Sequence, residues 1–247
     1  WHLGFHEPFL PRNQGFDHYY GLLHNLDPVE IGYFEKQGGV PLIRNGKVIK
    51  RPADPAELTR LYTDEAVKFI GANKERPFFL YLPHTMPHIP LYATPPFEGK
   101  SEIGLYGDTI EELDWSTGQI LETLRKLKID QNTLVIYTSD NGPWKLATNS
   151  WAKGNMNRRV GGFAHPLKGY KFSRFEGGMR VPTVMWWPGR IPAGKECSEV
   201  GASMDFLPTC AAISGAKMPD DRMIDGKNLL SLMEGRKGAK SPHEAFF

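Results

Sequence analysis

The sequence predicts an α/β protein with a largely parallel sheet and helices on both faces of that sheet. Two observations support this prediction. Apolar residues recur at helical spacing in two long stretches, and short apolar runs typical of buried strands lie between and after them. Strands that alternate with helices are joined by right-handed crossovers, which set the strands parallel. The composition agrees, because 40% hydrophobic and 23% charged residues are ordinary for a globular domain.

The first half of the chain changes character at about residue 55. Residues 1–55 are rich in Gly, Pro, Asn and aromatics, which favours long loops with short strands such as Gly39–Asn45. Asp54 is expected to cap a helix that begins at Pro55. The apolar positions of this helix recur at helical spacing: Leu58, Leu61, Tyr62, Ala66, Phe69 and Ile70. Pro77–Leu82 is apolar on both sides and therefore predicts a buried strand.

The second half repeats the alternation of helix and strand. The expected elements are a helix over Asp108–Leu127, a strand over Thr133–Thr138, a loop over 143–170, a strand over Val181–Trp187 and a helix over Met204–Ile213. Gly215 is expected to end the last helix. Three such strands are few for 247 residues, and neither end of the sequence shows the usual punctuation. We therefore expect residues 1–247 to be one piece of a longer domain, with a sheet that is incomplete on its N-terminal side.

Several classes of function find no support in the sequence. The net charge of +2 gives no overall attraction to nucleic acid. Neither a phosphate-binding G-x-x-x-x-G-K-[ST] motif nor a G-x-G-x-x-G motif occurs. No apolar run approaches the 18 residues that a membrane span needs, and no signal peptide is evident. Cys197 and Cys210 are the only cysteines, too few for a disulfide framework or a zinc site.

Asp140-Asn141-Gly142 follows directly after the expected strand 133–138. Asn-Gly is a strong turn signal, so a simple turn is one interpretation. The other is a site for a hard metal ion, because Asp and Asn both offer the oxygen ligands that Ca²⁺ or Mg²⁺ requires. Gly142 would then let the backbone bend so that the two side chains converge on one ion. Two ligands are too few for calcium, so further ligands must come from elsewhere.

His84 and His88 follow the expected strand 77–82. Two histidines four residues apart on a helix can share a metal, but Pro87 and Pro90 make a helix unfavourable. Two interpretations remain open. The histidines lie on the surface of a proline-stiffened loop, or one of them is held over a pocket as an acid or hydrogen-bond donor.

A basic stretch runs from Lys145 to Arg180. It holds eight basic residues against the single acid Glu176. Such an excess is typical of a solvated loop, and it also attracts polyanions. Trp144 and Trp151 add aromatic faces on which sugars can stack.

Five motifs together resemble type I sulfatases, in the arylsulfatase A and N-acetylgalactosamine-6-sulfatase branch of the alkaline phosphatase superfamily. In chain order they are WHLG…GFDHYYG, PFFLYLPHTMPHIPLY, LYGDTIEELDWSTGQIL, VIYTSDNGP and LKGYKFSRFEGGMRVPTVMWWPG. The resemblance covers nearly the whole chain. It implies an alkaline-phosphatase-like α/β fold, sulfate-ester hydrolysis of a sugar or aryl alcohol, and one bound calcium ion.

The resemblance also implies roles for particular residues. Asp140 and Asn141 match calcium ligands of the family. His2 matches the histidine that contacts the formylglycine nucleophile, whereas His88 and Lys171 match residues that bind sulfate and assist the leaving oxygen. Asn25 stands where many relatives have a serine near the nucleophile, so it is expected to contact the substrate. Their matching order predicts that these side chains converge on one pocket at the carboxyl ends of the strands.

Two family features are missing from these 247 residues. Formylglycine forms from Cys or Ser in a [CS]-x-P-x-R motif, which does not occur here, nor do two of the family's calcium aspartates. We therefore expect the nucleophile and the small C-terminal subdomain to lie outside this chain, which should be inactive by itself. Two alternatives stay open: an inactive protein that binds sulfated glycans, and a phosphate-ester or phosphonate hydrolase of the same superfamily. By resemblance, the protein is exported or lysosomal.

Overall fold

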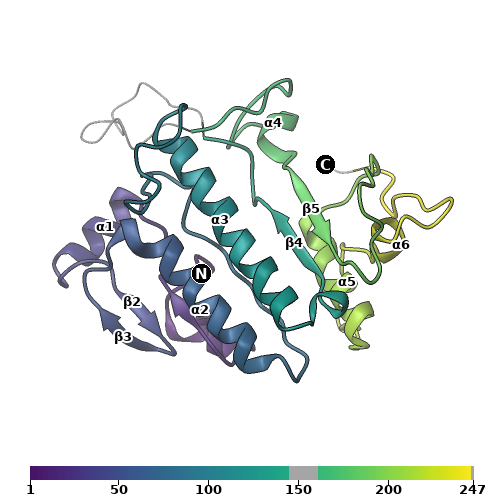
Figure 1. The fold of residues 1–247 in the computed structure, drawn as a ribbon, viewed down its shortest axis with the longest axis horizontal. Coiled ribbons are helices and arrows are strands. Elements are labelled where there is room, and N and C mark those ends of the chain that lie inside the picture. Colours follow the sequence, from purple (N-terminus) through teal and green to yellow (C-terminus); the bar gives the residue numbers. More distant parts are fainter. Residues whose placement is uncertain (145–160, 246–247) are drawn as a thin grey trace. The chain divides into compact units, whose positions relative to one another are not determined.

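A computed structural model describes residues 1–144 and 161–245, without the side chains of residues 28–30. The chain divides into two compact units (Figure 1). Unit 1 comprises Trp1–Leu127 and Gly142–Arg180, and unit 2 comprises Lys128–Asn141 and Val181–Phe247. The expected assignment of all 247 residues to part of one catalytic domain stays a prediction.

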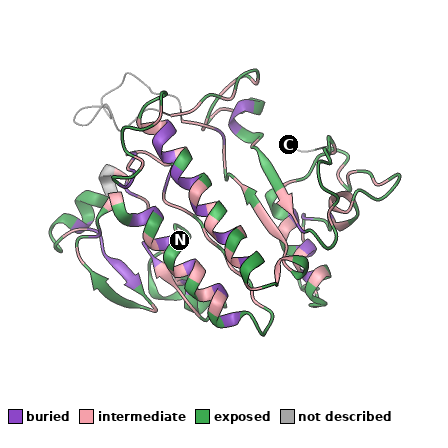
Figure 2. Cartoon of the chain, in the orientation of Figure 1, coloured by how far each residue is buried: buried purple, intermediate pink, exposed green. Residues whose placement is uncertain are grey.

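Two long helices form the centre of unit 1. Helix α2 spans Leu58–Asn73 and helix α3 spans Leu105–Lys126, and the two pack against each other. Both predicted helices are confirmed, although α3 begins three residues earlier than expected. Buried positions recur along both helices (Figure 2), as the apolar spacing requires. Asp54 acts as a cap, since its Oδ1 accepts from the N–H of Ala56, but the capped element is a 3₁₀ turn that leads into α2.

The first 55 residues form loops, short strands and one helix. Strands β1 (Tyr20–Gly21), β2 (Leu42–Arg44) and β3 (Lys47–Lys50) form an antiparallel sheet in that order. The expected loops with short strands are therefore confirmed. Helix α1 (Pro28–Glu35) has no counterpart among the predicted elements.

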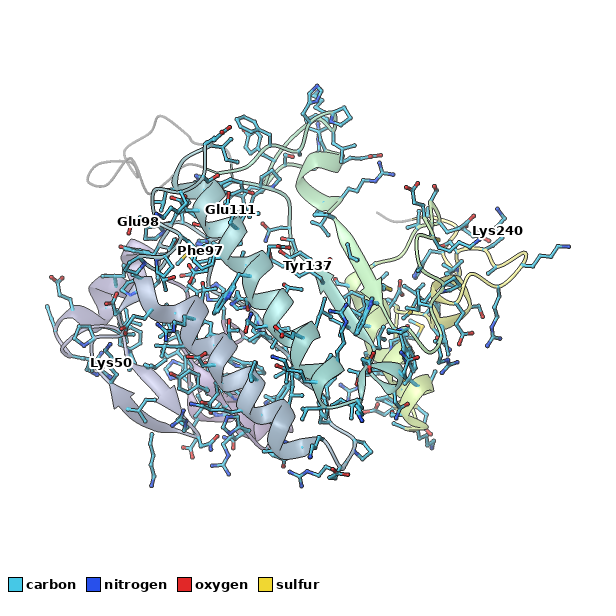
Figure 3. All side chains as sticks on the ribbon, viewed as in Figure 1. Lys50, Phe97, Glu98, Glu111, Tyr137 and Lys240 are labelled. Carbon is cyan, nitrogen blue, oxygen red and sulfur yellow. The ribbon has the colours of Figure 1, made fainter. Side chains whose placement is uncertain are left out.

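Unit 2 contains the strand that precedes Asp140. Strand β4 (Val135–Thr138) pairs antiparallel with β5 (Thr183–Trp186), and Tyr137, labelled in Figure 3, lies opposite Val184. Helix α5 (Phe206–Ser214) ends at Gly215, whose φ of 74° is left-handed as predicted. Two further helices are short, α4 (Glu176–Met179) in unit 1 and α6 (Leu230–Met233) in unit 2.

Two expectations differ from the structure. Both sheets in the described parts of the chain are antiparallel, whereas the sequence predicted largely parallel pairing. Apolar patterns indicate burial, but the neighbouring strand sets the direction of pairing. No strand is assigned to Pro77–Leu82 within the described residues, and this prediction was wrong. Phe79 is 63% exposed and Tyr81 49%, so the two-sided burial inferred from their apolar character is not found in unit 1.

Candidate active site

His88 is held by the backbone around it. Its Nδ1 lies 2.7 Å from the carbonyl oxygen of Ile89. Because a carbonyl oxygen can only accept, Nδ1 carries a proton. The N–H of His88 also donates to the carbonyl of Thr85 at 3.2 Å. The half-buried ring is therefore oriented, and Nε2 is the nitrogen left to interact with a ligand.

His2 is exposed and has an unusual backbone conformation. Its φ of 55° lies in the left-handed region, which residues other than glycine seldom adopt. The N–H of His2 donates to the carbonyl of Leu23 at 2.9 Å. This bond attaches the His2 backbone to the segment that carries Asn25. Strained conformations of this kind are found disproportionately at functional sites.

Asn25 shapes the turn that leads into α1. Its Oδ1 accepts from the N–H of Asp27 at 3.1 Å, and its Nδ2 donates to Oδ2 of Asp27 at 3.1 Å. Asp27 is the residue at the start of α1. The amide of Asn25 is therefore already engaged, and its expected contact with the substrate stays a prediction.

Lys171 lies in the loop that precedes α4. Its N–H donates to the carbonyl of Pro143 at 2.9 Å, and its ammonium lies 5.5 Å from the centre of the Phe172 ring. Glu176, the nearest acid in sequence, pairs with Arg180 at 3.1 Å. The lysine is half-buried and carries the charge that an anionic group requires.

Asp140 and Asn141 lie immediately after β4 and contact each other. The Nδ2 of Asn141 donates to Oδ2 of Asp140 over 2.6 Å, and the hydroxyl of Ser139 donates to the carbonyl of Asn141 at 3.0 Å. The two side chains offer oxygen ligands only, so they fit part of a calcium site. Within the described chain, no group of three His, Cys, Asp or Glu residues is arranged to hold a metal.

Gly142 is needed for packing rather than for a bend. Its φ is not left-handed, but a Cβ at this position would overlap the carbonyl oxygen of Gly177. The N–H of Gly142 donates to the carbonyl of Gly178 at 2.9 Å. The backbone at Gly142 thus lies directly against the backbone at Gly177-Gly178.

The predicted site residues fall in both units. His2, Asn25, His88 and Lys171 belong to unit 1, whereas Asp140 and Asn141 belong to unit 2. Within unit 1 the structure brings the backbone of His2 to Leu23 and that of Lys171 to Pro143. The convergence of all six side chains on one pocket stays a prediction.

The basic stretch is only partly described. Four of its eight basic residues and one tryptophan lie outside the described residues: Lys145, Lys153, Arg158, Arg159 and Trp151. Of the others, Lys168 lies 4.1 Å from the centre of the Phe175 ring and Arg180 pairs with Glu176. Binding of a polyanion by this stretch therefore stays a prediction. None of the described helices has the length and apolar character of a membrane span.

His84 was given no role by the sequence but has a distinct environment. Its Nε2 lies 3.2 Å from the hydroxyl of Ser116, and its Nδ1 is buried without a hydrogen-bond partner. Burial lowers the pKa of His84 to about 4. No local sequence signal marks this environment, because its partner Ser116 lies 32 residues further along the chain, on α3.

Comparison with known families decides the family of the chain. The sulfatase family model matches residues 1–216. The chain belongs to the sulfatase family. The predicted type I sulfatase resemblance is therefore confirmed.

Individual relatives support the same family. The chain is 42% identical over 206 residues to human steryl-sulfatase and 37% identical over 248 residues to dog N-acetylgalactosamine-6-sulfatase. These alignments cover 83% and 95% of this chain but only 34% and 45% of the relatives. The chain thus spans less than half the length of these sulfatases.

Solved sulfatase structures confirm the α/β fold class. The structure of Ps i-CgsB in complex with k-i-k-neocarrahexaose has a TM-score of 0.74 and 32% sequence identity, covering 95% of this chain and 53% of that one. The PsFucS1 sulfatase from Pseudoalteromonas sp. has a TM-score of 0.77 and 26% identity, covering 94% of this chain and 50% of that one. The alkaline-phosphatase-like α/β fold expected from the sequence is therefore shared with sulfatases.

Proposed function

We propose that the chain forms part of the catalytic domain of a sulfuric ester hydrolase, which cleaves the sulfate ester of a sugar or an aryl alcohol. The match of residues 1–216 to the sulfatase family carries the reaction class. The orientation of His88 by the carbonyl of Ile89 supports its role in that reaction. The formylglycine nucleophile is supplied from outside these 247 residues, since they contain no [CS]-x-P-x-R motif.

Four side chains are assigned to the sulfate group, its leaving oxygen and the nucleophile. In its protonated, cationic form His88 donates from Nε2 to the leaving oxygen, since Nδ1 donates to the backbone and a neutral ring would leave Nε2 with only a lone pair. Lys171 places a positive charge against the sulfate, whose negative charge is spread over its oxygens. His2 moves a proton at the nucleophile, and Asn25 contacts the substrate from the segment to which the His2 backbone is hydrogen-bonded.

Asp140 and Asn141 are the residues that would hold calcium. A bound calcium ion supplies Lewis acidity and orients the sulfate. Both side chains offer hard oxygen atoms at the end of β4, which supports their assignment. The two residues contribute only part of the 6–8 ligands that calcium typically takes.

We propose that backbone contacts within unit 1 hold Lys171 in place for this role. The support comes from the chain that follows Asn141. Gly142 donates to the carbonyl of Gly178, and Pro143 accepts from the N–H of Lys171 at 2.9 Å. The backbone immediately after the metal-binding pair is thus fixed to the loop that carries Lys171. We further propose that the protein is exported or lysosomal, as the family resemblance implies.

The test compares two classes of ester. The complete gene product that contains this chain is purified and assayed with an aryl sulfate and with the corresponding aryl phosphate, each with calcium and after chelation. Hydrolysis of the sulfate ester that declines on chelation supports the proposal. Preference for the phosphate ester assigns the protein to the other hydrolases of the superfamily. Binding of sulfated glycans without hydrolysis supports the non-catalytic alternative.

A further inference from the structure

Three polar side chains on one face of α3 are buried where the apolar pattern predicts none. Asp108, Glu112 and Ser116 are spaced four residues apart, and each is 1% exposed. All three contact the segment 84–101, which carries His88. Figure 3 labels Phe97 and Glu98 of this segment beside α3, in agreement with the 5.9 Å between the rings of Phe97 and Trp115. Buried polar groups on a helix are costly unless they are paired, so their partners are informative.

Asp108 and Glu112 bind the C-terminal part of segment 84–101. The carboxylate of Asp108 accepts from three backbone N–H groups, those of Gly99 at 2.8 Å, Lys100 at 3.0 Å and Ser101 at 2.7 Å. Burial raises the pKa of Asp108, but these donors outweigh it and lower the pKa below its ordinary value. Glu112 accepts from both the N–H and the hydroxyl of Thr94, at 2.9 and 2.8 Å. Residues 94–101 are therefore anchored to α3.

Ser116 binds the N-terminal end of the segment through a chain of hydrogen bonds in which each donor can be identified. The hydroxyl of Thr63 donates to the carbonyl of Thr59 at 2.7 Å, because a carbonyl can only accept. Thr63 Oγ1 therefore accepts from the hydroxyl of Ser116, 2.6 Å away. Ser116 Oγ in turn accepts from Nε2 of His84 at 3.2 Å.

This direction fixes the tautomer of His84. Nε2 carries the proton, so Nδ1 holds a lone pair, and it is buried without a partner. A second proton on Nδ1 would be a buried donor with no acceptor. The neutral ring is therefore the form that the site accommodates, and burial lowers the pKa of His84 in the same sense.

A short path connects these anchors to His88. The hydroxyl of Thr85, the residue after His84, lies 3.1 Å from the hydroxyl of Tyr62 on α2. The carbonyl of Thr85 accepts from the N–H of His88. His84 is thus hydrogen-bonded to α3 and Thr85 to α2. The backbone of Thr85 is in turn hydrogen-bonded to the backbone of His88.

We propose that His84 is a positioning residue that orients His88, and that the row Asp108, Glu112 and Ser116 on α3 holds the segment in which both histidines lie. This inference rests on the proposed function of His88. In this proposal, His84 and α3 affect the reaction by holding His88 in place, and they do not contact the substrate.

The experiment combines activity with hydrogen exchange in the complete gene product. Ser116→Ala removes the acceptor for His84 Nε2, and Thr117→Ala is the matched control, because its hydroxyl donates to Leu113 within α3. Ser116→Ala should lower kcat about 10- to 100-fold, as misplaced supporting groups do. It should also speed amide exchange in residues 84–90. Thr117→Ala should change neither quantity. Glu112→Gln provides a second variant should Ser116→Ala fail to fold, with faster exchange expected at residue 94.

A double-mutant cycle with His88 distinguishes the positioning of His88 from a general structural effect of Ser116→Ala. In a His88→Asn background, Ser116→Ala should cause no further loss of kcat, although its effect on exchange persists. An equal loss of kcat in both backgrounds would overturn the positioning role. Unchanged exchange in Ser116→Ala and Glu112→Gln would overturn it whatever the activity. A full-rate His88→Asn enzyme would instead refute the proposed role of His88, and this inference would fall with it.

Discussion

The amide of Asn141 donates to the carboxylate of Asp140 over 2.6 Å, so the two side chains after β4 lie against each other. This contact makes them a pair that can turn their oxygen atoms toward one cation. Asn141→Ala should weaken calcium affinity and sulfatase activity together in the complete gene product, because one oxygen ligand is lost. Calorimetric titration of the chelator-treated protein with calcium, alongside the activity assay, measures both.

The same position offers a test of metal preference. Asn141→His should shift preference toward zinc, because imidazole suits zinc better than calcium. Gln131→Ala is a control for unit 2, since the exposed side chain of Gln131 donates to Oδ2 of the neighbouring Asp130 at 3.3 Å, and its backbone carbonyl accepts from Trp187. Unchanged metal content and activity in Asn141→Ala would remove Asn141 from the metal site.

Two lysines in the same loop allow a matched comparison. Lys171→Met should lower kcat/KM about 10²- to 10³-fold, the usual loss when a donor to a developing charge is removed. Lys168→Met should leave kcat/KM near the wild-type value, because the Lys168 ammonium lies over the Phe175 ring. Steady-state kinetics with an aryl sulfate decide between them. Equal losses in the two variants would show that the loop contributes only its general charge.

The buried imidazole of His84 predicts a loss of stability in mild acid. Its folded-state pKa of about 4 lies below the ordinary value of 6.5, so the folded protein binds the proton less readily than the unfolded chain. The stability is therefore complete above about pH 6.5 and falls as the pH drops toward 4, by about 3 kcal/mol at most. His84→Gln cannot titrate and should lose less stability over this range.

Thermal unfolding at pH 7 and at pH 4 measures this difference. The neighbouring Tyr62, whose pKa burial raises to about 12, stays neutral throughout and does not contribute. An identical fall in Tm for wild type and His84→Gln would show that other groups cause the acid sensitivity.

The helices were the part of the fold that the sequence predicted best. The spacing of Leu113, Ile120 and Leu124 marks the buried face of α3, and all three are buried in the structure. Pro77–Leu82 was misread because an apolar segment looks the same whether it pairs in a sheet or runs extended without a ladder. An apolar pattern also does not indicate whether two strands pair parallel or antiparallel. The antiparallel pairing of β4 with β5 could therefore not be predicted from it.

For the candidate site, too, the sequence predicted some residues and missed others. His88 and Lys171 were predicted for the site because they lie in motifs with a family resemblance, and the structure adds the hydrogen bonds that each of them makes with the backbone. Glu112 and Ser116 were missed because acids and serines on a helix usually mark the solvent-exposed face. Their burial depends on partners far away in sequence, such as Thr94 and His84, which no local pattern reveals.

The central claim is that His88 acts in the hydrolysis of a sulfate ester. His88→Asn tests it sharply, because the shorter amide can still donate to the carbonyl of Ile89 but has no counterpart of Nε2. The exposed His165 supplies the control, His165→Asn.

The measurement is the rate at which the complete gene product releases inorganic sulfate from an aryl sulfate. We expect clear release by the wild type and by His165→Asn, and a rate about 10²- to 10⁴-fold lower in His88→Asn with an unchanged Tm, the loss typical of a general acid. Sulfate release by His88→Asn at the wild-type rate, or no release by the wild type, would contradict the claim.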